Sequence, residues 1–381
     1  MAVRLNMENY ISEIIECIGK RQLSLDRFTD SILVTVYDPR KNNKLNLPKG
    51  WHDANFKTRT RVAKDSGGFR LLVDPELGKV FDVNKVIEAH NRIGFGDHDI
   101  IMAADFPIPT GVSLSNEEVA RRHILSVEWY DTMKKQLPQT IPALHGRNLE
   151  EILYHKSMYG IEEKQLVMLG SNLAQTTPPN AMGRIGKGRK RGEPAKVTPK
   201  KKVWERIMEV VPKLESDVFL LGAGGMNAAP IASMLGASHT DASSWRLNAK
   251  MFAIYNTVNG RYVKCGDKGK NIMVSKNQDF LKTRLEDESY PFYGMKLEHL
   301  NKVFQSHGSK ATEIRGIHNV WELKKDNEVY NEFEGDPDGL AKMLRKRWTS
   351  SGWTDHQNLK LLDRVERVVN SSTKELELFV A

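Results

Sequence analysis

Short runs of apolar residues alternate along the chain with longer stretches in which apolar residues recur at helical spacing. The short runs are too brief for helices and predict buried strands of a parallel sheet. They are ILVTV at 32–36, IIMAA at 100–104, IPAL at 141–144, LVML at 166–169 and VFLL at 218–221. The longer stretches predict amphipathic helices at 117–136, 148–159, 203–214 and 226–235.

This alternation of strands and helices predicts an α/β fold. Units of this kind either close into a (β/α)8 TIM barrel or spread into an open, doubly wound sheet. Neither GxGxxG nor GxxxxGK[ST] follows any of the predicted strands, which removes the commonest nucleotide-binding versions of the open sheet. We therefore expect a TIM barrel with insertions, followed by an ordinary amphipathic helix at 354–378.

Composition adds expectations about partners and compartment. With 381 residues, a hydrophobic share of 40% and a formal net charge of +9, the chain suits one large domain with a polyanionic partner, although a merely soluble basic protein is the alternative. Cys17 and Cys265 are the only cysteines, as expected in a reducing compartment. The N-terminus lacks an apolar signal region and no stretch is apolar enough to span a bilayer, so we expect a cytoplasmic enzyme without a membrane partner.

One segment, residues 183–202, breaks the alternation. Its sequence, GRIGKGRKRGEPAKVTPKKK, has one acidic residue, Glu193, and no aliphatic periodicity, which predicts a mobile basic loop. A solvated linker is the alternative. Such a run suits phosphate contacts, and the candidate nucleic-acid-binding residues are Arg184, Lys187, Arg189, Lys190, Arg191, Lys196, Lys200, Lys201 and Lys202.

Polar residues and glycines come directly after the predicted strands. In a (β/α)8 barrel these positions line the active site, because the loops after the strands gather there. Any one Asp could instead be a helix cap or a turn acid, but three carboxylates around one pocket repel one another unless protons, donors or a developing cation offset them, as in catalysis. The residues at predicted strand ends are Asp65, Asp105, His145, Gly146, Gly170, Ser171, Gly222, Gly224, Gly225 and Asp241.

Four segments together resemble the tRNA-guanine transglycosylases in order and approximate spacing. They are DSGGFR at 65–70, IIMAADFPIP at 100–109, LLGAGGM at 220–226 and GASHTDASSW at 236–245. The resemblance is greater to the phage relatives that act on DNA, the DNA-guanine transglycosylases. It implies an enzyme that exchanges guanine in DNA for a 7-deazaguanine base such as preQ0, through a covalent bond between an Asp and the sugar.

The resemblance also implies a role for each matching residue. Asp241 stands at the position of the nucleophile and Asp65 at that of the acid/base, with His239 as a reserve candidate for proton transfer. Asp105 would recognise the Watson–Crick edge of the base, and His145 replaces a base-contacting glutamine, which leaves the incoming base open. Phe69 and Leu221 would sandwich the ring, and further polar or backbone contacts would come from Ser66, Gly170, Ser171 and Gly222.

The zinc module of that family, a CxCPxC run followed by a histidine, is replaced here by ESYPFY at 288–293 with His318 further on. Without thiolates a structural zinc site does not hold its metal, so we expect no metal, no other cofactor, and an apolar and aromatic core in its place. The spacing of His299 and His307 to His318 matches no ligand pattern. The resemblance divides the chain into the main part of the barrel at 1–275, a degenerate zinc-module-like insertion at 276–325 and a C-terminal helical segment at 326–381.

The loss of the zinc module favours DNA over tRNA as the substrate, by resemblance alone. Three alternatives stay open: a tRNA-guanine transglycosylase that has lost its zinc site, a non-catalytic barrel that binds nucleic acid, and an unrelated barrel lyase or aldolase. No lysine follows a predicted strand in an apolar setting, which argues against Schiff-base chemistry.

Overall fold

The structure is a computed structural model. It describes residues 8–13, 31–37, 61–68, 71, 75–94, 96, 98–108, 114–170, 200–242, 244–266, 272–350 and 354–380. At 8–13, 200–202 and 372–380 only the backbone is described.

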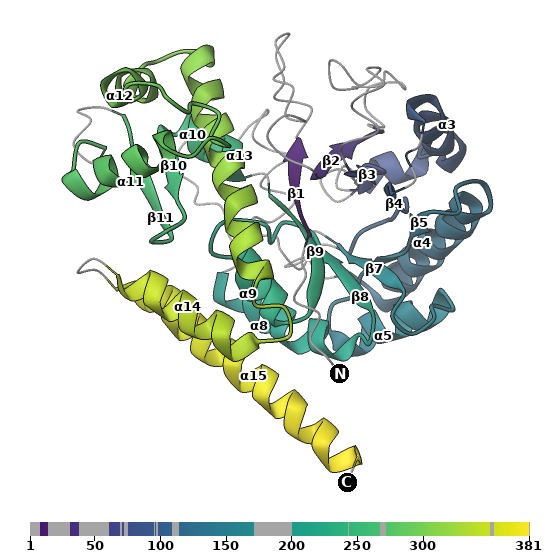
Figure 1. Cartoon of the computed structure of the whole chain (residues 1–381). Coiled ribbons are helices and arrows are strands. Elements are labelled where there is room, and N and C mark those ends of the chain that lie inside the picture. Colours follow the sequence, from purple (N-terminus) through teal and green to yellow (C-terminus); the bar gives the residue numbers. More distant parts are fainter. Residues whose placement is uncertain are drawn as a thin grey trace, which may run out of the picture.

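The described strands form one large parallel sheet and one small hairpin (Figure 1). The large sheet has nine strands in the order β5-β4-β3-β2-β1-β9-β8-β7-β6, and all its neighbours pair in parallel. Its strands are β1 (Glu8–Glu13), β2 (Ser31–Thr35), β3 (Arg61–Asp65), β4 (Ile100–Met102), β5 (Thr140–Ile141), β6 (Ala143–Leu144), β7 (Leu166–Leu169), β8 (Asp217–Leu220) and β9 (Ala237–Ala242).

The strands at the two ends of this order, β5 and β6, are consecutive in the chain. Only Pro142 separates them, because proline has no N–H to donate to a strand ladder. The carbonyls of Ile141 and Pro142 still accept hydrogen bonds, one from each neighbouring segment. The Ala103 N–H donates to Ile141 O over 3.0 Å, and the Met168 N–H donates to Pro142 O over 2.8 Å. The run IPAL, expected as one strand, is therefore two short ones that pair with different neighbours.

Apart from the break at Pro142, helices separate the strands of the large sheet from β3 onward, which confirms the expected α/β class with a parallel sheet. They are α3 (Val83–Ile93), α4 (Asn116–Gln136), α5 (Leu149–Met158), α8 (Lys200–Val210), α9 (Ala229–Met234) and α10 (Ser244–Lys250), with 3-10 turns at Pro75–Lys79 and Val211–Lys213. Side chains cap three of them: Asp82 accepts from the Asn84 N–H, Ser115 accepts from the Glu118 N–H, and Asn148 accepts from the Glu151 N–H.

Some boundaries differ from those expected. The loop expected to reach residue 202 ends earlier, because α8 begins at Lys200; its three lysines are good helix formers. The same helix ends at Val210 rather than 214, because Pro212 lacks the N–H that a further α-helical turn needs. The helix expected at 226–235 is shorter and begins next to Pro230, a residue suited to a first helical turn.

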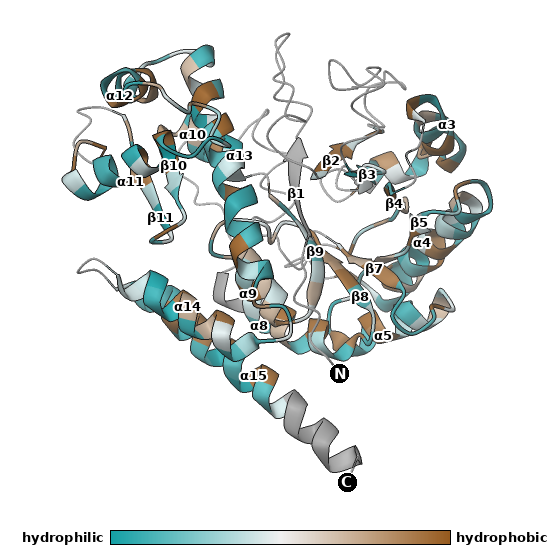
Figure 2. Ribbon diagram, in the orientation of Figure 1, coloured by the Kyte–Doolittle hydropathy of each residue, from teal (hydrophilic) through white to brown (hydrophobic). Residues whose placement is uncertain are grey.

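The large sheet has a face covered by helices and a second, inner face. Residues such as Val62, Val167 and Val218 point to the helices and join large apolar clusters there. Residues at alternating positions form a separate group, here called the inner cluster: Leu33, Ala63, Met102, Ile141, Ala143, Met168 and Phe219. Figure 2 shows apolar residues along strands β7 and β8, as burial on both faces requires.

The C-terminal third forms a smaller core and a helical pair. The hairpin β10 (Ala253–Asn256) and β11 (Arg261–Lys264) packs with α11 (Ser275–Leu285), α12 (Leu297–Gln305) and α13 (Ser309–Asn331). Helix α14 (Pro337–Thr349) lies beside α15 (His356–Val380), and α15 runs past the rest of the molecule (Figure 1). None of the helices in the described ranges is both long and apolar enough to cross a membrane.

The segment ESYPFY contributes an aromatic core, as expected from its sequence. Tyr290 is 2% exposed and packs against Phe292, Trp321 and His318. The His318 Nε2–H donates to the Tyr255 carbonyl over 2.8 Å, so His318 Nδ1 accepts from the Tyr290 hydroxyl over 2.7 Å. Burial lowers the pKa of His318, which keeps this imidazole neutral while it makes one hydrogen bond through each ring nitrogen.

Replacing Tyr290 by Phe should therefore lower the free energy of unfolding by about 1 to 2 kcal/mol, because it leaves the buried His318 Nδ1 without its donor. Urea denaturation followed by circular dichroism measures the change. Tyr293→Phe is the matched control, since Tyr293 lies in the same segment and is 53% exposed. Equal effects of the two substitutions would contradict the structural role of the Tyr290–His318 bond.

Candidate active site

Two of the expected carboxylates lie on the inner face at the carboxyl ends of their strands. Asp65 is the last residue of β3 and comes two positions after Ala63 of the inner cluster. Asp241 lies in β9 two positions after His239, whose ring stacks on Phe219 of the same cluster at 5.6 Å. Side chains two apart on a strand share a face, so both carboxylates extend the inner face beyond its apolar part.

Asp65 is held by two donors on one side and faces negative charge on the other. Its Oδ2 accepts from the Thr35 hydroxyl over 2.9 Å, and its Oδ1 accepts from the Gly67 N–H over 3.2 Å. Burial and the charge of Asp105, with a smaller contribution from Asp241, outweigh these donors and raise the pKa of Asp65 to about 6. A carboxyl group with this pKa can both give and take a proton near neutral pH.

Asp241 is tied to the glycine-rich turn after β8. Its Oδ1 accepts from the Gly222 N–H, and its backbone carbonyl accepts from the Gly224 N–H over 2.7 Å. Gly222 has a φ of +81°, a conformation that favours glycine. The turn therefore holds one oxygen of the carboxylate. Asp241 is still 8% exposed, so a small part of the residue remains accessible.

Asp105 lies in close contact with His145. The structure corrects its expected position, because β4 ends at Met102 and Asp105 lies three residues further, in the following loop. His145 Nε2 lies 2.5 Å from Asp105 Oδ2, although the contact departs from the direction of a regular hydrogen bond. Asp105 is 4% and His145 1% exposed, so the pair is buried next to Asp65.

Two glycines leave room for this pair. A Cβ at Gly68 would lie 1.8 Å from Asp105 Oδ1, and one at Gly170 would lie 2.1 Å from His145 Cε1. Both distances are far below van der Waals contact, so any side chain at 68 or 170 would displace the acid or the imidazole. Gly170 is thus brought to the site as expected, but the structure gives it a steric role in addition to the backbone contact that the resemblance implies.

The side chains on either side of Asp65 point away from the inner face. The Ser66 hydroxyl donates to the Met102 carbonyl and lies 3.1 Å from His90 Nε2, fully buried. Lys64 is also fully buried and pairs with Asp99 Oδ2 at 2.5 Å. A buried lysine therefore does lie at a strand end, contrary to the expectation, but on the opposite face from Asp65 and engaged with a carboxylate.

His239, the reserve candidate for proton transfer, lies deeper in the inner face than Asp241. Burial and the charge of Arg61 lower the pKa of His239 to about 4. Arg61 begins β3 at the end opposite Asp65, so the imidazole is neutral and sits towards the amino ends of the strands. Asp65 lies at the carboxyl end of β3 instead.

Several expected site residues lie outside the described part of the chain. They are Phe69, Ser171, Arg184, Lys187, Arg189, Lys190 and Arg191. The side chains of Lys200, Lys201 and Lys202 are likewise not described, although their backbone begins α8. Leu221 and Gly222 are described and lie next to Asp241 at the end of β8.

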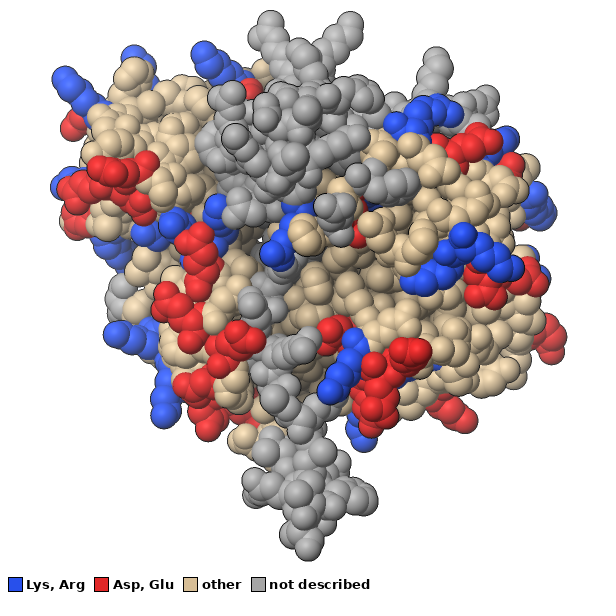
Figure 3. Space-filling model, turned by 45° about the vertical axis from the view of Figure 1, so that its right-hand side comes forward, with Lys and Arg blue, Asp and Glu red and all other residues tan. Residues whose placement is uncertain are grey.

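Basic and acidic side chains are intermingled on the described part of the face in Figure 3. Residues 183–202 carry nine Lys and Arg against the single Glu193, so this segment accounts for nearly all of the formal net charge of +9. The positive charge expected for a nucleic-acid partner is therefore concentrated in one segment of the sequence, residues 183–202, rather than spread over the described surface.

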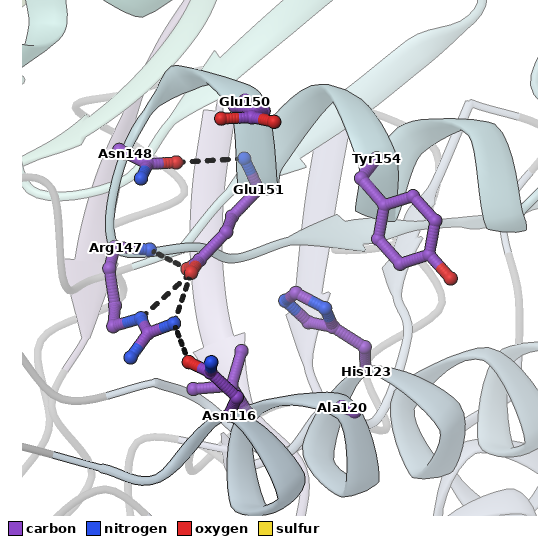
Figure 4. Close-up of a pocket in the computed structure, with 9 residues that line it drawn as sticks. Asn116, Ala120, His123, Arg147, Asn148, Glu150, Glu151 and Tyr154 are labelled. Carbon is purple, nitrogen blue, oxygen red and sulfur yellow. Dashed lines mark hydrogen bonds and ion pairs between the residues drawn. The ribbon is translucent and has the colours of Figure 1, made fainter.

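A surface pocket lies between α4 and α5, on the outer side of the β6 strand end (Figure 4). Arg147 spans its rim, with its guanidinium 2.8 Å from Asn116 Oδ1 and 2.5 Å from Glu151 Oε1. His123 lines the pocket and bonds through Nε2 to the His145 carbonyl over 3.0 Å. None of the three carboxylates Asp65, Asp105 and Asp241 lines this pocket, so the pocket adjoins the strand end that carries His145 and is separate from the carboxylates.

Sequence reasoning missed Thr35 and Gly68. A threonine at the end of an apolar run looks like an ordinary strand residue, and the second glycine of DSGG looks like part of a turn. Pairing β2 with β3 would have placed Thr35 beside Asp65, which is the signal that could have found it. The contact between Gly68 and Asp105 joins segments that are distant in the sequence and has no such signal.

A scan against models of protein families gives no match to this sequence, and a search of curated proteins gives none either.

The raised pKa of Asp65 predicts a pH-dependent loss of stability. Below the unfolded-state pKa, near 4, both states are protonated; as the pH rises to about 6 the unfolded chain ionises first, which penalises the folded state. Relative to Asp65→Asn, the wild-type protein should lose about 1 to 3 kcal/mol of unfolding free energy between pH 4 and pH 7. Urea titrations of both proteins at several pH values measure this difference, and a difference that does not change with pH would contradict the assigned environment.

Proposed function

We propose that this protein exchanges a guanine base in a nucleic acid for a 7-deazaguanine, with Asp241 as the nucleophile and Asp65 as the acid/base. The observation that carries the proposal is the contrast between two neighbouring carboxylates. Asp241 accepts a backbone N–H from the Gly222 turn, whereas burial and the charge of Asp105 raise the pKa of Asp65 to about 6. Two acids with such different environments are the usual basis for dividing nucleophile and acid/base roles.

A (β/α)8 barrel is the architecture we propose for this site. It is supported by the strand order, in which β5 and β6 are the two ends and yet differ by one residue in the chain. If β5 and β6 are counted as one strand, the sheet has eight parallel strands that close into a barrel, and the side chains of the inner cluster fill its interior. The carboxylates then lie at the carboxyl end, where such barrels carry their active sites.

The reaction needs a carboxylate that can capture a sugar and a second one that can carry a proton. The bond between C1′ and the base nitrogen breaks, the departing guanine takes its electron pair and a proton from Asp65, and an Asp241 oxygen bonds to C1′. The incoming 7-deazaguanine then gives its ring proton to Asp65, bonds to C1′ and releases Asp241. The energy of the glycosidic bond is kept in the ester, so no nucleotide hydrolysis is required.

The groups around the two acids support a base between them. Asp105 would accept from the Watson–Crick edge, and Leu221, partly exposed beside the inner cluster, would cover one face of the ring. The contact of the ring with Phe69 and Ser171 rests on the resemblance. The Ser66 hydroxyl is engaged with Met102 and His90, so a contact from Ser66 would come from its backbone.

DNA is the polymer we propose. The support is the resemblance to phage enzymes that act on DNA, together with Tyr290 in place of a zinc-binding thiolate in the core that packs around His318. The basic segment 183–202 would follow the phosphate backbone. A guanine would be flipped out of the stack to reach the carboxylates, at a cost of a few kcal/mol in duplex DNA.

Asp241→Asn should abolish exchange, because an amide oxygen cannot form the ester with C1′. The measurement is the incorporation of radiolabelled preQ0 or guanine into DNA and into unmodified tRNA, with covalent protein–nucleic acid adducts counted on denaturing gels. Asp131→Asn, an exposed acid on α4, is the matched control and should retain full exchange.

Each result of that assay separates one interpretation from the others. Incorporation into DNA that is lost only in Asp241→Asn supports the proposal. Incorporation into tRNA alone would refute DNA as the substrate, and incorporation into neither polymer would refute base exchange. Undiminished exchange by Asp241→Asn would refute the nucleophile.

Deleting residues 186–192 should weaken binding to DNA and flatten its salt dependence. Each phosphate contact contributes about 0.7 to 0.9 to the slope of log affinity against log salt, and the deletion removes Lys187, Arg189, Lys190 and Arg191. Fluorescence anisotropy between low and moderate salt measures both effects. An unchanged slope would identify the segment as a solvated linker.

A further inference from the structure

His145 is placed so that it acts on Asp105 rather than on the reacting atoms. The imidazole Nε2 lies 2.5 Å from Asp105 Oδ2, and both side chains are buried. Asp105 in turn raises the pKa of Asp65, and Asp241 does so to a smaller extent. Three acidic side chains thus influence one another, and His145 is the basic side chain in contact with Asp105.

The pair cannot easily rearrange. Gly68 lies directly against Asp105 Oδ1, and Gly170 lies directly against the imidazole ring. The backbone of His145 is fixed as well: its N–H donates to His155 Nδ1 over 3.1 Å, and its carbonyl accepts from His123 Nε2 over 3.0 Å. Burial lowers the pKa of both supporting histidines, so they act as neutral groups that hold the strand end in place.

The contact favours one form of Asp105. A cation or N–H donor this close stabilises a carboxylate. A buried acid beside other acids, without such a partner, tends instead to take up a proton. Both ring nitrogens are buried, and neither makes a regular hydrogen bond with the described residues, so the close approach of Nε2 to Asp105 Oδ2 is the polar contact that the structure gives to this ring.

We propose that His145 is a positioning residue that keeps Asp105 as a carboxylate and thereby makes the pocket select bases that present N–H donors. This inference rests on the proposed base exchange, in which Asp105 faces the edge of the base. A carboxylate only accepts hydrogen bonds, whereas a carboxylic acid also donates one. His145 therefore determines which kind of base edge the pocket can bind.

The class of ligand follows from this. A 2-amino-6-oxopurine and its 7-deaza analogues carry adjacent N–H donors at N1 and the 2-amino group, which match a carboxylate. Adenine has an acceptor at ring N1 and matches the protonated acid instead. With His145 in place the pocket should bind guanine-type bases and reject adenine; without it this preference should weaken or reverse.

The first test needs no substrate. Carbon-13 NMR of protein labelled at the Asp carboxyl, with the Asp105 signal assigned by loss in Asp105→Asn, reports the form of this acid at pH 7. We expect a carboxylate signal in the wild type and in His145→Gln, which keeps an N–H donor, and a carboxylic-acid signal in His145→Phe. A carboxylate signal in His145→Phe would overturn the proposal.

The second test measures base selection by isothermal titration with guanine, hypoxanthine and adenine. His145→Phe should weaken guanine binding by at least about tenfold, the loss expected for a hydrogen bond to a charged group, while His145→Gln recovers most of it. His239→Phe is the matched control, because it removes another, partly buried histidine of the inner face, which stacks on Phe219. Equal losses in His145→Phe and His239→Phe would reduce His145 to a packing residue.

The two tests separate this inference from the proposed function. The NMR result decides whether His145 keeps Asp105 as a carboxylate, even for a protein that exchanges no base. If the wild type binds none of the three bases, base selection is refuted together with the proposed function. If it binds guanine and His145→Phe binds it equally well, only the inference about His145 fails.

Discussion

Carboxylates that converge on one point must each be held by donors, and this requirement organises the site. Asp65 has the Thr35 hydroxyl and the Gly67 N–H, Asp241 has the Gly222 N–H, and Asp105 has the His145 imidazole. For Asp65, burial and the charge of Asp105 outweigh the two donors and raise its pKa to about 6, so the acids do not have equivalent surroundings. That difference allows neighbouring groups of the same chemical type to take separate roles.

Much of the surrounding structure serves to place these donors. Parallel pairing of β2 with β3 sets Thr35 opposite Asp65, and the pairing of β8 with β9 brings the Gly222 turn to Asp241. Behind β6, His123 and His155 hold the backbone of His145 from the helices α4 and α5. The outer pocket of Figure 4 adjoins this support, which is why its residues are close to the site in space without taking part in it.

The sequence predicted those features whose cause is local. Apolar runs such as LVML became the strands expected of them, because burial on both faces demands continuous apolar residues. Asp65 and Asp241 were also expected at strand ends, and they lie at or next to the carboxyl ends of β3 and β9. The break at Pro142 also has a local cause, the missing N–H of proline. It was not predicted because IPAL looks like one short apolar strand.

Features that depend on distant segments could not be read in this way. The outward direction of Ser66 depends on Met102 and His90, and the pairing of Lys64 depends on Asp99. The pair between Asp105 and His145 joins two loops and requires glycine at two further positions. Residue type alone predicted that these positions carry reactive or polar groups. The direction in which each side chain points could be known only from the assembled sheet.

The absence of side chains at Gly68 and Gly170 has a consequence for redesign. Because the space next to these two positions is filled by the acid and the imidazole that lie against them, a side chain added at 68 or 170 has no room unless Asp105 or His145 moves. For the base exchange that we propose, a variant meant to accept a different base would have to replace Asp105 and His145 as a unit, with residues whose combined shape still fits between two bare backbone positions. Single substitutions at any of the four sites would change packing and hydrogen bonding at once, so these four residues have to be redesigned as one group.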